Sequence, residues 1–189
     1  MKKIIFACIM ATAFVAPAHA EGTYVGLGVT TTSHSSYESD TKGALKLFGG
    51  YDFTPTWGIE AGYMDIPSFK TNYAFSSMSG EGVGLTYSGE THGKAMYIAG
   101  KATMAISDKF ALVTKLGIGH ERVHQTYTAP GSVYQHTVMT NELYAGIGLK
   151  YSLSEKTALT LELERLGSTS RYNSGIRPEK VSLNASYRF

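Results

Sequence analysis

The sequence alternates between apolar and polar residues with a period of two, and the alternation recurs in eight separate runs. Between Leu159 and Glu164, for example, three leucines alternate with Thr160, Glu162 and Glu164. A period of two places one set of side chains on each face of a β-strand, whereas an amphipathic helix repeats about every 3.6 residues. The eight runs cover residues 25–29, 45–53, 57–63, 96–106, 110–118, 142–151, 159–164 and 181–189. Eight alternating runs of up to about ten residues, separated by turn residues, are typical of a transmembrane β-barrel.

The connections between these runs are of two kinds. Three are short turns, at residues 54–56, 107–109 and 152–156. Four are long and rich in Ser, Thr and Gly, at roughly residues 32–42, 66–92, 121–138 and 167–178. Strands of soluble β-sandwich proteins also alternate between apolar and polar residues. Outer-membrane barrels, however, combine short periplasmic turns with long external loops. We therefore expect an all-β fold, an eight-stranded antiparallel transmembrane β-barrel, with both termini in the periplasm and the four long segments as external loops.

Aromatic residues gather beside the short turns and at the end of the chain. Those beside the turns are Tyr51, Phe53, Trp57, Phe110 and Tyr151, and the last run adds Tyr187 and Phe189. Amphipathic rings are favoured at the membrane–water interface, whereas the core aromatics of a soluble protein would scatter along the strands. The sequence therefore predicts an aromatic ring at one membrane interface.

The first twenty residues have the three-part layout of a secretory signal peptide. Lys2 and Lys3 precede an apolar run over residues 4–15, and small residues lead up to Ala20. We expect residues 1–20 to be cleaved and residues 21–189 to form the outer-membrane barrel. Cleavage would remove Cys8, the only cysteine, which excludes a disulfide framework, a thiol nucleophile and a cysteine-ligated metal. It would also reduce the 17 Lys and Arg residues by two, to match the 15 Asp and Glu residues, and a neutral chain gives no electrostatic basis for binding nucleic acid.

The last run ends on Phe189, with Val181, Leu183 and Tyr187 at alternate positions before it. This pattern resembles the C-terminal assembly signal of Gram-negative outer-membrane proteins. The resemblance implies that the outer-membrane assembly machinery is a partner of the chain.

Taken together, the runs resemble the OmpA-like transmembrane domain family of small outer-membrane barrels. The matching stretches are residues 24–28, 49–51, 57–63, 115–119, 161–165 and 181–189. The resemblance implies a location in the Gram-negative cell outer membrane, contact with outer-membrane lipids including lipopolysaccharide, and a structural role in envelope integrity. Many members carry a second, peptidoglycan-binding domain after the barrel, whereas this sequence stops at Phe189. We therefore do not expect a role as a wall tether.

Ten charged residues fall on the inward parity of the expected barrel. They are Lys46, Asp52, Glu60, Lys101, Lys115, Glu142, Lys150, Glu162, Glu164 and Arg188. The interior of an eight-stranded barrel is just wide enough to be filled by side chains, and charges buried there are stable only when they are paired. Because five carboxylates balance five bases, we predict a lumen plugged by an ion-pair network rather than a glycosidase-like carboxylate pair. A minor or gated pore, in which the ion pairs rearrange, is an alternative.

Residues near the expected external rim leave one enzymatic alternative open. Small outer-membrane barrels include lipid A-modifying enzymes, which place a serine and a histidine at this rim. The candidates are Ser88 with His92, His120 or His124, and Glu90 or Glu121 as an orienting group. Such a hydrolase needs its nucleophile and base within hydrogen-bond reach, and no motif fixes that arrangement. No third metal ligand is visible beside the histidines either, so we predict no enzyme, no metal and no cofactor.

The expected loops contain aromatic residues amid Ser, Thr and Gly. They are Tyr73, Phe75, Tyr87, Tyr127, Tyr134 and Tyr172. This mixture suits adaptable contacts with protein partners. We therefore predict a structural outer-membrane protein whose loops add recognition of a host or surface ligand, such as adhesion.

Overall fold

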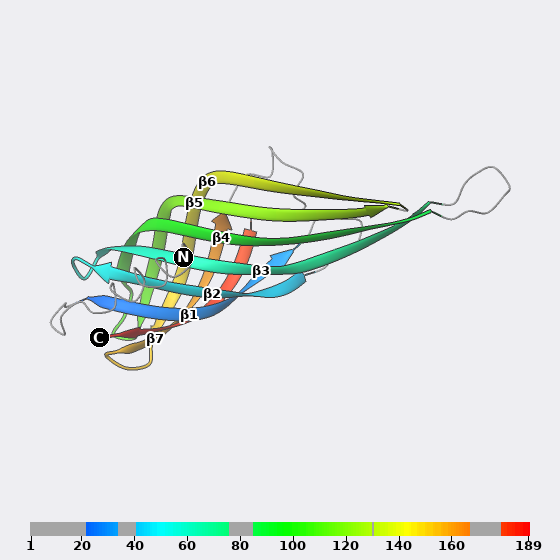
Figure 1. Ribbon diagram of the computed structural model, residues 1–189. Coiled ribbons are helices and arrows are strands. Elements are labelled where there is room, and N and C mark those ends of the chain that lie inside the picture. The colour runs from blue at the N-terminus through cyan, green and yellow to red at the C-terminus, as the bar shows by residue number, and fades with distance from the viewer. Residues whose placement is uncertain (1–21, 34–40, 76–84, 130, 167–178) are drawn as a thin grey trace.

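The computed structural model describes residues 22–33, 41–75, 85–129, 131–166 and 179–189. The strands are β1 (Thr23–Ser33), β2 (Thr41–Asp52), β3 (Trp57–Phe75), β4 (Leu85–Ala105), β5 (Phe110–Ala129), β6 (Ser132–Ser152), β7 (Thr157–Leu166) and β8 (Glu179–Arg188). Each strand pairs antiparallel with its neighbours in chain order, and β1 also pairs with β8, which closes the barrel (Figure 1). The expected eight-stranded antiparallel barrel is confirmed. No helix among the described residues is long and apolar enough to cross a membrane.

The two faces of the strands are inverted relative to a soluble protein. Leu116 and Ile118 on β5 are 64% and 66% exposed, whereas Lys46 on β2 and Glu162 on β7 are 2% and 1% exposed. Apolar side chains therefore point outward and charged side chains point into the barrel. A bilayer stabilises this arrangement because lipid, rather than water, surrounds the apolar face.

The outward face carries an uncharged band whose height fits a membrane. Along β4 and the first residue after it, the band runs from Met96 to Ile106, and both side chains are exposed. With a rise of about 3.4 Å per residue and a tilt of about 40°, it spans about 26 Å, close to the apolar band of about 25 Å in outer-membrane barrels. The first charged outward residues beyond it, at the edge away from the short turns, are Asp65, Lys94, Arg122, Arg165 and Glu179.

A side-chain hydroxyl stabilises each of the three short turns. The side-chain oxygen of Thr54 accepts a hydrogen bond from the backbone N–H of Trp57 at 2.9 Å. Ser107 and Ser154 accept equivalent bonds from the residues three positions later, at 3.2 and 3.1 Å. Hydroxyl side chains in this position hold a turn by bonding the nearby backbone, which fixes where β3, β5 and β7 begin.

The aromatic residues predicted as an interface ring all lie at this end of the barrel. Their side chains are at least partly exposed on the outward face: Tyr51, Phe53, Trp57, Phe110, Tyr151, Tyr187 and Phe189. Several contact one another, with ring centroids 5.4 Å apart for Tyr51 and Phe53 and 5.0 Å apart for Phe110 and Tyr151. Val181 and Leu183, predicted as part of the assembly signal, point outward from β8.

The prediction that residues 66–92 and 121–138 are loops is wrong for most of both segments. The strands β3 and β4, and β5 and β6, continue past the apolar band as two long hairpins, which extend beyond the rest of the barrel in Figure 1. In the second hairpin the pairing persists from Phe110 opposite Tyr151 to Ala129 opposite Ser132. Past the membrane neither face of a hairpin meets lipid, so the regular apolar alternation that revealed the other strands is lost while backbone pairing continues. Residues 1–21, 34–40 and 167–178 lie outside the described residues, as do the side chains of Tyr73, Phe75 and Tyr87.

An irregularity in β3 reverses the face on which its later residues lie. The register with β4 shifts between Ile66 and Phe69, around Pro67. Proline cannot donate a ladder hydrogen bond, and a bulge is one of the places where a strand tolerates it. Because of the shift, both Ile66 and Phe69 point inward and are 2% exposed.

Candidate functional site

Three glutamates and two lysines meet in the middle of the barrel. The Lys115 ammonium on β5 lies 2.7 Å from the Glu60 carboxylate on β3 and 2.9 Å from that of Glu162 on β7. Lys46 on β2 lies 3.5 Å from Glu162 and forms a second ion pair with Glu164. All five side chains are at most 4% exposed. Buried charges are stable only when paired in this way, so these contacts tie four strands together across the lumen.

Neutral donors add further hydrogen bonds to the three carboxylates, which exceed the lysines by one. Glu60 accepts hydrogen bonds from the hydroxyls of Tyr24 at 2.9 Å and Tyr97 at 2.5 Å. Glu164 accepts from the hydroxyls of Tyr144 and Ser182. Glu162 accepts from the side-chain amide of Asn184 at 3.1 Å. These donors let the barrel hold an extra carboxylate in a buried site, because hydrogen bonds to an ionised group are among the stronger ones.

A second ion-pair group lies nearer the short turns. Asp52 on β2 forms ion pairs with Lys101 on β4 and Arg188 on β8, each at 2.6 Å. The Lys101 ammonium also lies 3.9 Å from the centre of the Tyr24 ring. Since the Tyr24 hydroxyl bonds Glu60, Tyr24 connects this group to the central network.

Eight of the ten charged residues predicted for the lumen therefore take part in ion pairs with one another. In the part of the chain that the structure describes, Glu142 and Lys150 form no ion pair with the other eight. Glu142 is opposite Gly119, near the external end, and Lys150 lines a cavity near the turns. The structure also buries Lys180, on β8, which is opposite Glu164. Lys180 continues the inward parity of β8, a signal that was available in the sequence.

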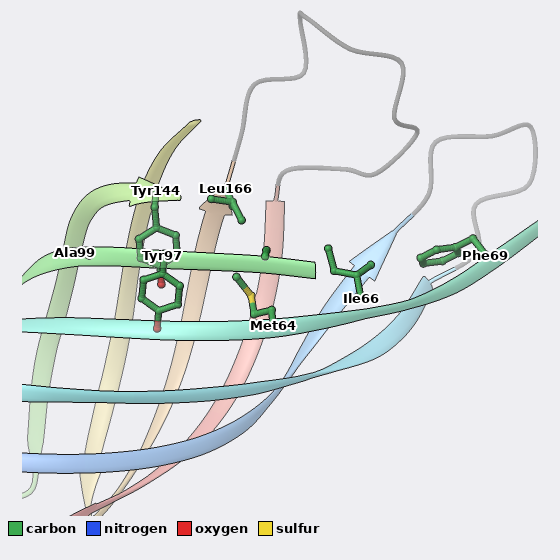
Figure 2. Packing of buried hydrophobic residues seen from close by; sticks show 8 residues of the cluster. Met64, Ile66, Phe69, Tyr97, Ala99, Tyr144 and Leu166 are labelled. Atoms are coloured by element: carbon green, nitrogen blue, oxygen red, sulfur yellow. The ribbon is translucent and has the colours of Figure 1, made fainter. Parts of the chain in front are cut away.

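The external half of the lumen contains a cluster of buried, mostly apolar side chains, which we call the plug. Its members are Met64, Ile66, Phe69, Ala95, Tyr97, Ala99, Tyr144 and Leu166. Figure 2 shows the rings of Tyr97 and Tyr144 lying against each other inside the barrel, with Met64 and Leu166 nearby. An inward apolar cluster was not foreseen, although Tyr97 lies on the inward parity of its run.

On the turn side of the network a polar cavity of about 230 Å³ remains. Among its lining residues are Lys101, Lys150 and Arg188, together with Ser154 and Thr157 from the last short turn. No plug residue lines it. The cavity is therefore a recess that opens at the turn end and stops at the ion pairs.

Glycine makes room for the largest inward rings. A Cβ atom at Gly62 would collide with the Tyr97 ring, and one at Gly26 would collide with the Phe48 ring. Glycine at these positions leaves space for an aromatic side chain of the neighbouring strand to lie flat against the barrel wall. The glycines that alternate with apolar residues in the sequence thus shape the lumen.

The rim histidines lie on the outward face, with His92 and His124 beyond the apolar band and His120 at its edge, opposite Met96. His92 on β4 is opposite His124 on β5, and their rings stack with centroids 5.0 Å apart. The nitrogen Nδ1 of His124 lies 2.9 Å from the Thr137 hydroxyl, and that of His120 lies 2.8 Å from the Asn141 amide oxygen. Partial desolvation, followed by the positive charges of neighbouring residues, lowers the pKa of His124 below its usual value.

This geometry does not bring the enzymatic candidates together. Ser88 is opposite Thr128, four positions along β4 from His92, which separates the two by about 13 Å along the strand. Glu121 has the inward parity of β5, whereas His120 and His124 lie on its outward face. No cluster of three metal-ligating side chains occurs among the described residues.

The sequence matches a family model described as "Outer membrane protein beta-barrel domain" over residues 4–189. It is 29% identical to outer membrane protein A of Salmonella typhi over 152 residues, which are 75% of this chain and 39% of that protein. The chain thus spans about two fifths of the length of the curated relatives it matches.

Two solved structures illustrate the similarity of fold. One is Ail, the attachment invasion locus protein of Yersinia pestis, in complex with the heparin analogue sucrose octasulfate. Its TM-score is 0.57 at 17% identity, over 89% of this chain and 99% of that one. The other is the N-terminal β-barrel domain of Pseudomonas aeruginosa OprF, with a TM-score of 0.55 at 13% identity, over 89% of this chain and 98% of that one.

Proposed function

Because the chain belongs to the outer membrane protein β-barrel domain family, we propose that it is a sealed structural barrel that contributes to envelope integrity and presents its external hairpins for surface recognition. Its location is the outer membrane of Gram-negative bacteria. The outward apolar band faces lipid there, and the short turns face the periplasm.

The closed lumen is the observation that carries the structural role. The ion pairs of Lys46 and Lys115 cross the barrel between strands that are distant in sequence, and the plug packs inside the barrel beyond them. A lumen blocked at two levels is unsuited to passing solutes, while the same contacts brace the wall from inside. A gated pore would require Lys46, Lys115 and their three carboxylates to separate while remaining buried, which is costly.

Envelope integrity is tested in cells that lack the protein. We expect increased sensitivity to detergent and to large antibiotics, restored by the wild-type gene. Restoration should also occur with a chain whose β5–β6 hairpin is shortened, because the membrane-spanning wall is unchanged. Wild-type resistance in the absence of the protein, across these agents, would contradict the structural role.

Surface recognition is supported by the external half of the β5–β6 hairpin. Tyr127 and Tyr134 face each other across its two strands and are 48% and 66% exposed, and Val133 is also exposed. Exposed large side chains of this kind, held on a paired ribbon, are suited to contact with a protein or a surface. The similarity to Ail, whose name refers to attachment, is consistent with a host or surface ligand.

The recognition role is tested by cell adhesion. We expect adhesion to fall when residues 125–136 are removed and β5 is rejoined to β6 through a short turn. The double substitution Tyr127→Ser and Tyr134→Ser should give the same fall without changing the length of the hairpin. Unchanged adhesion with both variants, at equal surface levels, would contradict this part of the proposal.

We also propose that residues 1–20 are removed as a secretory signal and that residues 21–189 form the barrel, which the outer-membrane assembly machinery inserts by recognising β8. N-terminal sequencing of the protein purified from outer membranes should give Glu21 as the first residue. A chain that begins at Met1 would contradict the cleavage.

The alternative of a lipid A-modifying enzyme is separated from this proposal by mass spectrometry of lipid A. We expect identical lipid A from cells with and without the protein, because Ser88 and the rim histidines stand apart. A lost or added acyl chain that depends on the protein would favour the enzyme.

A further inference from the structure

Two exposed cations lie directly opposite each other on the outer wall. Lys94 on β4 is paired in register with Arg122 on β5, and both side chains are exposed on the outward face. Among the residues that the structure describes, no carboxylate comes within 4.0 Å of either cation, although Asp65 is the partner of Lys94 on the other side. By contrast Arg165, at the same edge of the band, lies 3.9 Å from Glu179.

Such a pair is unfavourable by itself. Like charges directly opposite each other in an antiparallel sheet are destabilising. The two residues that follow on these strands away from the membrane, His92 and His124, add nitrogen bases instead of carboxylates, and Met139 is the other neighbour of Arg122. The positive charge of Arg122 and Lys94 contributes to the lowered pKa of His124, after desolvation. Asp65, opposite Lys94, is the only carboxylate in register with either cation among the described strands, so the Lys94–Arg122 pair keeps one positive charge in excess at this edge of the band.

The position of the pair relative to the membrane suggests what compensates it. On the outward face of β4, Met96 is the last residue of the uncharged band and Lys94 is the next outward residue away from the short turns. Ile98 and Ile118, which are paired with each other, lie within the band. An amphiphilic molecule bound against this part of the wall would place its acyl chains on the two isoleucines. Its polar head would then lie at the height of Lys94 and Arg122. The outer leaflet offers such an amphiphile in its phosphorylated lipids.

We propose that Lys94 and Arg122 together bind the phosphate group of an outer-leaflet lipid. The planar guanidinium of Arg122 presents paired donors to phosphate oxygens, and the Lys94 ammonium adds a point charge from the adjacent strand. Basic residues at a membrane surface attract anionic lipid heads in the same way. The site deepens the proposed function, because it gives the barrel a fixed contact with the lipid whose packing maintains the envelope.

The test measures lipid retained by the purified, folded barrel. Native mass spectrometry in a mild detergent is carried out with added bisphosphorylated lipid A, and in parallel with the same lipid A after its phosphates are removed. The variants are Lys94→Gln, Arg122→Gln and the double variant. Lys109→Gln, which removes an exposed cation from a short turn at the opposite membrane face, is the matched control. Each variant is first shown to be folded by its heat-dependent shift in gel mobility.

We expect the wild-type protein to retain bisphosphorylated lipid A more tightly than the dephosphorylated lipid. Each single substitution should weaken retention about fivefold and the double variant about 25-fold, from the usual contribution of one basic residue to lipid binding. Lys109→Gln should match the wild type, and inorganic phosphate in millimolar excess should not displace the lipid. Equal retention of the two lipids, or a double variant that retains lipid A as the wild type does, would overturn the proposal. Displacement by inorganic phosphate alone would overturn it as well, since it would show a free-anion site.

This assay is independent of the envelope phenotype. Loss of retention in the variants, together with unchanged envelope resistance in cells that lack the protein, would support the lipid site and contradict the structural role. Normal retention in the double variant, together with a strong envelope defect in cells without the protein, would contradict the lipid site and support the structural role.

Discussion

Tyr97 and Tyr144 stack inside the barrel with ring centroids 4.1 Å apart and an angle of 14° between their planes. Each uses its hydroxyl to bond a different carboxylate, Tyr97 that of Glu60 at 2.5 Å and Tyr144 that of Glu164. The two rings belong to the apolar plug, whereas their hydroxyls belong to the ion-pair network. The same side chains therefore belong to both layers that close the lumen. A substitution in the plug should therefore also alter the ion-pair network.

The hydroxyl and the ring of Tyr144 should make separable contributions to stability. Tyr144→Phe keeps the stack with Tyr97 but leaves the Glu164 carboxylate short of one donor, so we expect a loss of about 1–3 kcal/mol. Tyr144→Ala also removes the ring and leaves a cavity in the plug, so we expect a loss of about 3–5 kcal/mol. Urea unfolding in lipid vesicles, followed by the fluorescence of Trp57, the only tryptophan, measures both. Equal losses for the two variants would show that the stack contributes nothing.

Removal of Lys115 should be more damaging than removal of Lys101. Lys115→Met leaves Glu60 without an ion-pair partner and removes one of the two ion-pair partners of Glu162. An uncompensated buried charge costs about 3–5 kcal/mol of folding stability. Lys101→Met is the matched control, because Asp52 keeps Arg188 at 2.6 Å. We expect a clearly smaller loss for the control in the same unfolding assay. If the two losses were the same, the central network would not be the main internal brace.

Gly62 should be intolerant of a methyl group. In Gly62→Ala the new Cβ would collide with the Tyr97 ring, which is already held by its stack and its hydrogen bond, so we expect a loss of about 1–3 kcal/mol from overpacking. At Gly100, on the outward face of β4, the nearest atom to such a Cβ is 3.8 Å away. Gly100→Ala should therefore leave the unfolding midpoint almost unchanged. A neutral Gly62→Ala would mean that Tyr97 moves freely in the plug.

Leu161, exposed on the outward face of β7, tests which face meets lipid. Leu161→Arg should cost about 2–4 kcal/mol if the residue lies near the bilayer midplane, whereas the cost falls to about 0–1 kcal/mol near the interface. Leu153, exposed in the last short turn, provides the control at the interface. We expect assembly into lipid vesicles to be impaired for Leu161→Arg and normal for Leu153→Arg. Normal assembly of both variants would show that the outward face of β7 is not in lipid.

The eight membrane-spanning strands were predictable because lipid and lumen impose opposite requirements on alternate residues. Leu161 and Glu162 differ in polarity since one meets lipid and the other the network. In the external half of the β5–β6 hairpin neither face meets lipid, so the sequence around Thr126 and Gln135 shows no such contrast although the two residues are paired. This segment is rich in Thr, Tyr and Val, which favour strands, and Gly131 adopts a positive φ of 83° in the turn, but neither feature entered the prediction of a loop.

The inward position of the network charges followed from parity, but the pairing did not. Lys46 and Glu164 come from strands that are remote in sequence, and their encounter depends on how the strands cross the barrel. The plug was hidden for a related reason. Phe69 has outward parity if β3 is counted without its irregularity, and the register shift after Ile66 turns it inward.

Planar-bilayer conductance of the purified protein tests the sealed barrel most directly. With the plug and the ion pairs in place, we predict no discrete conductance steps above those of the protein-free bilayer at moderate voltage and neutral pH. Folded protein should be present in the same bilayers, shown by its protection from added protease. Steady, reproducible open-channel steps from the wild-type protein would contradict the account, because they would require a continuous path past Tyr97, Tyr144 and Lys115.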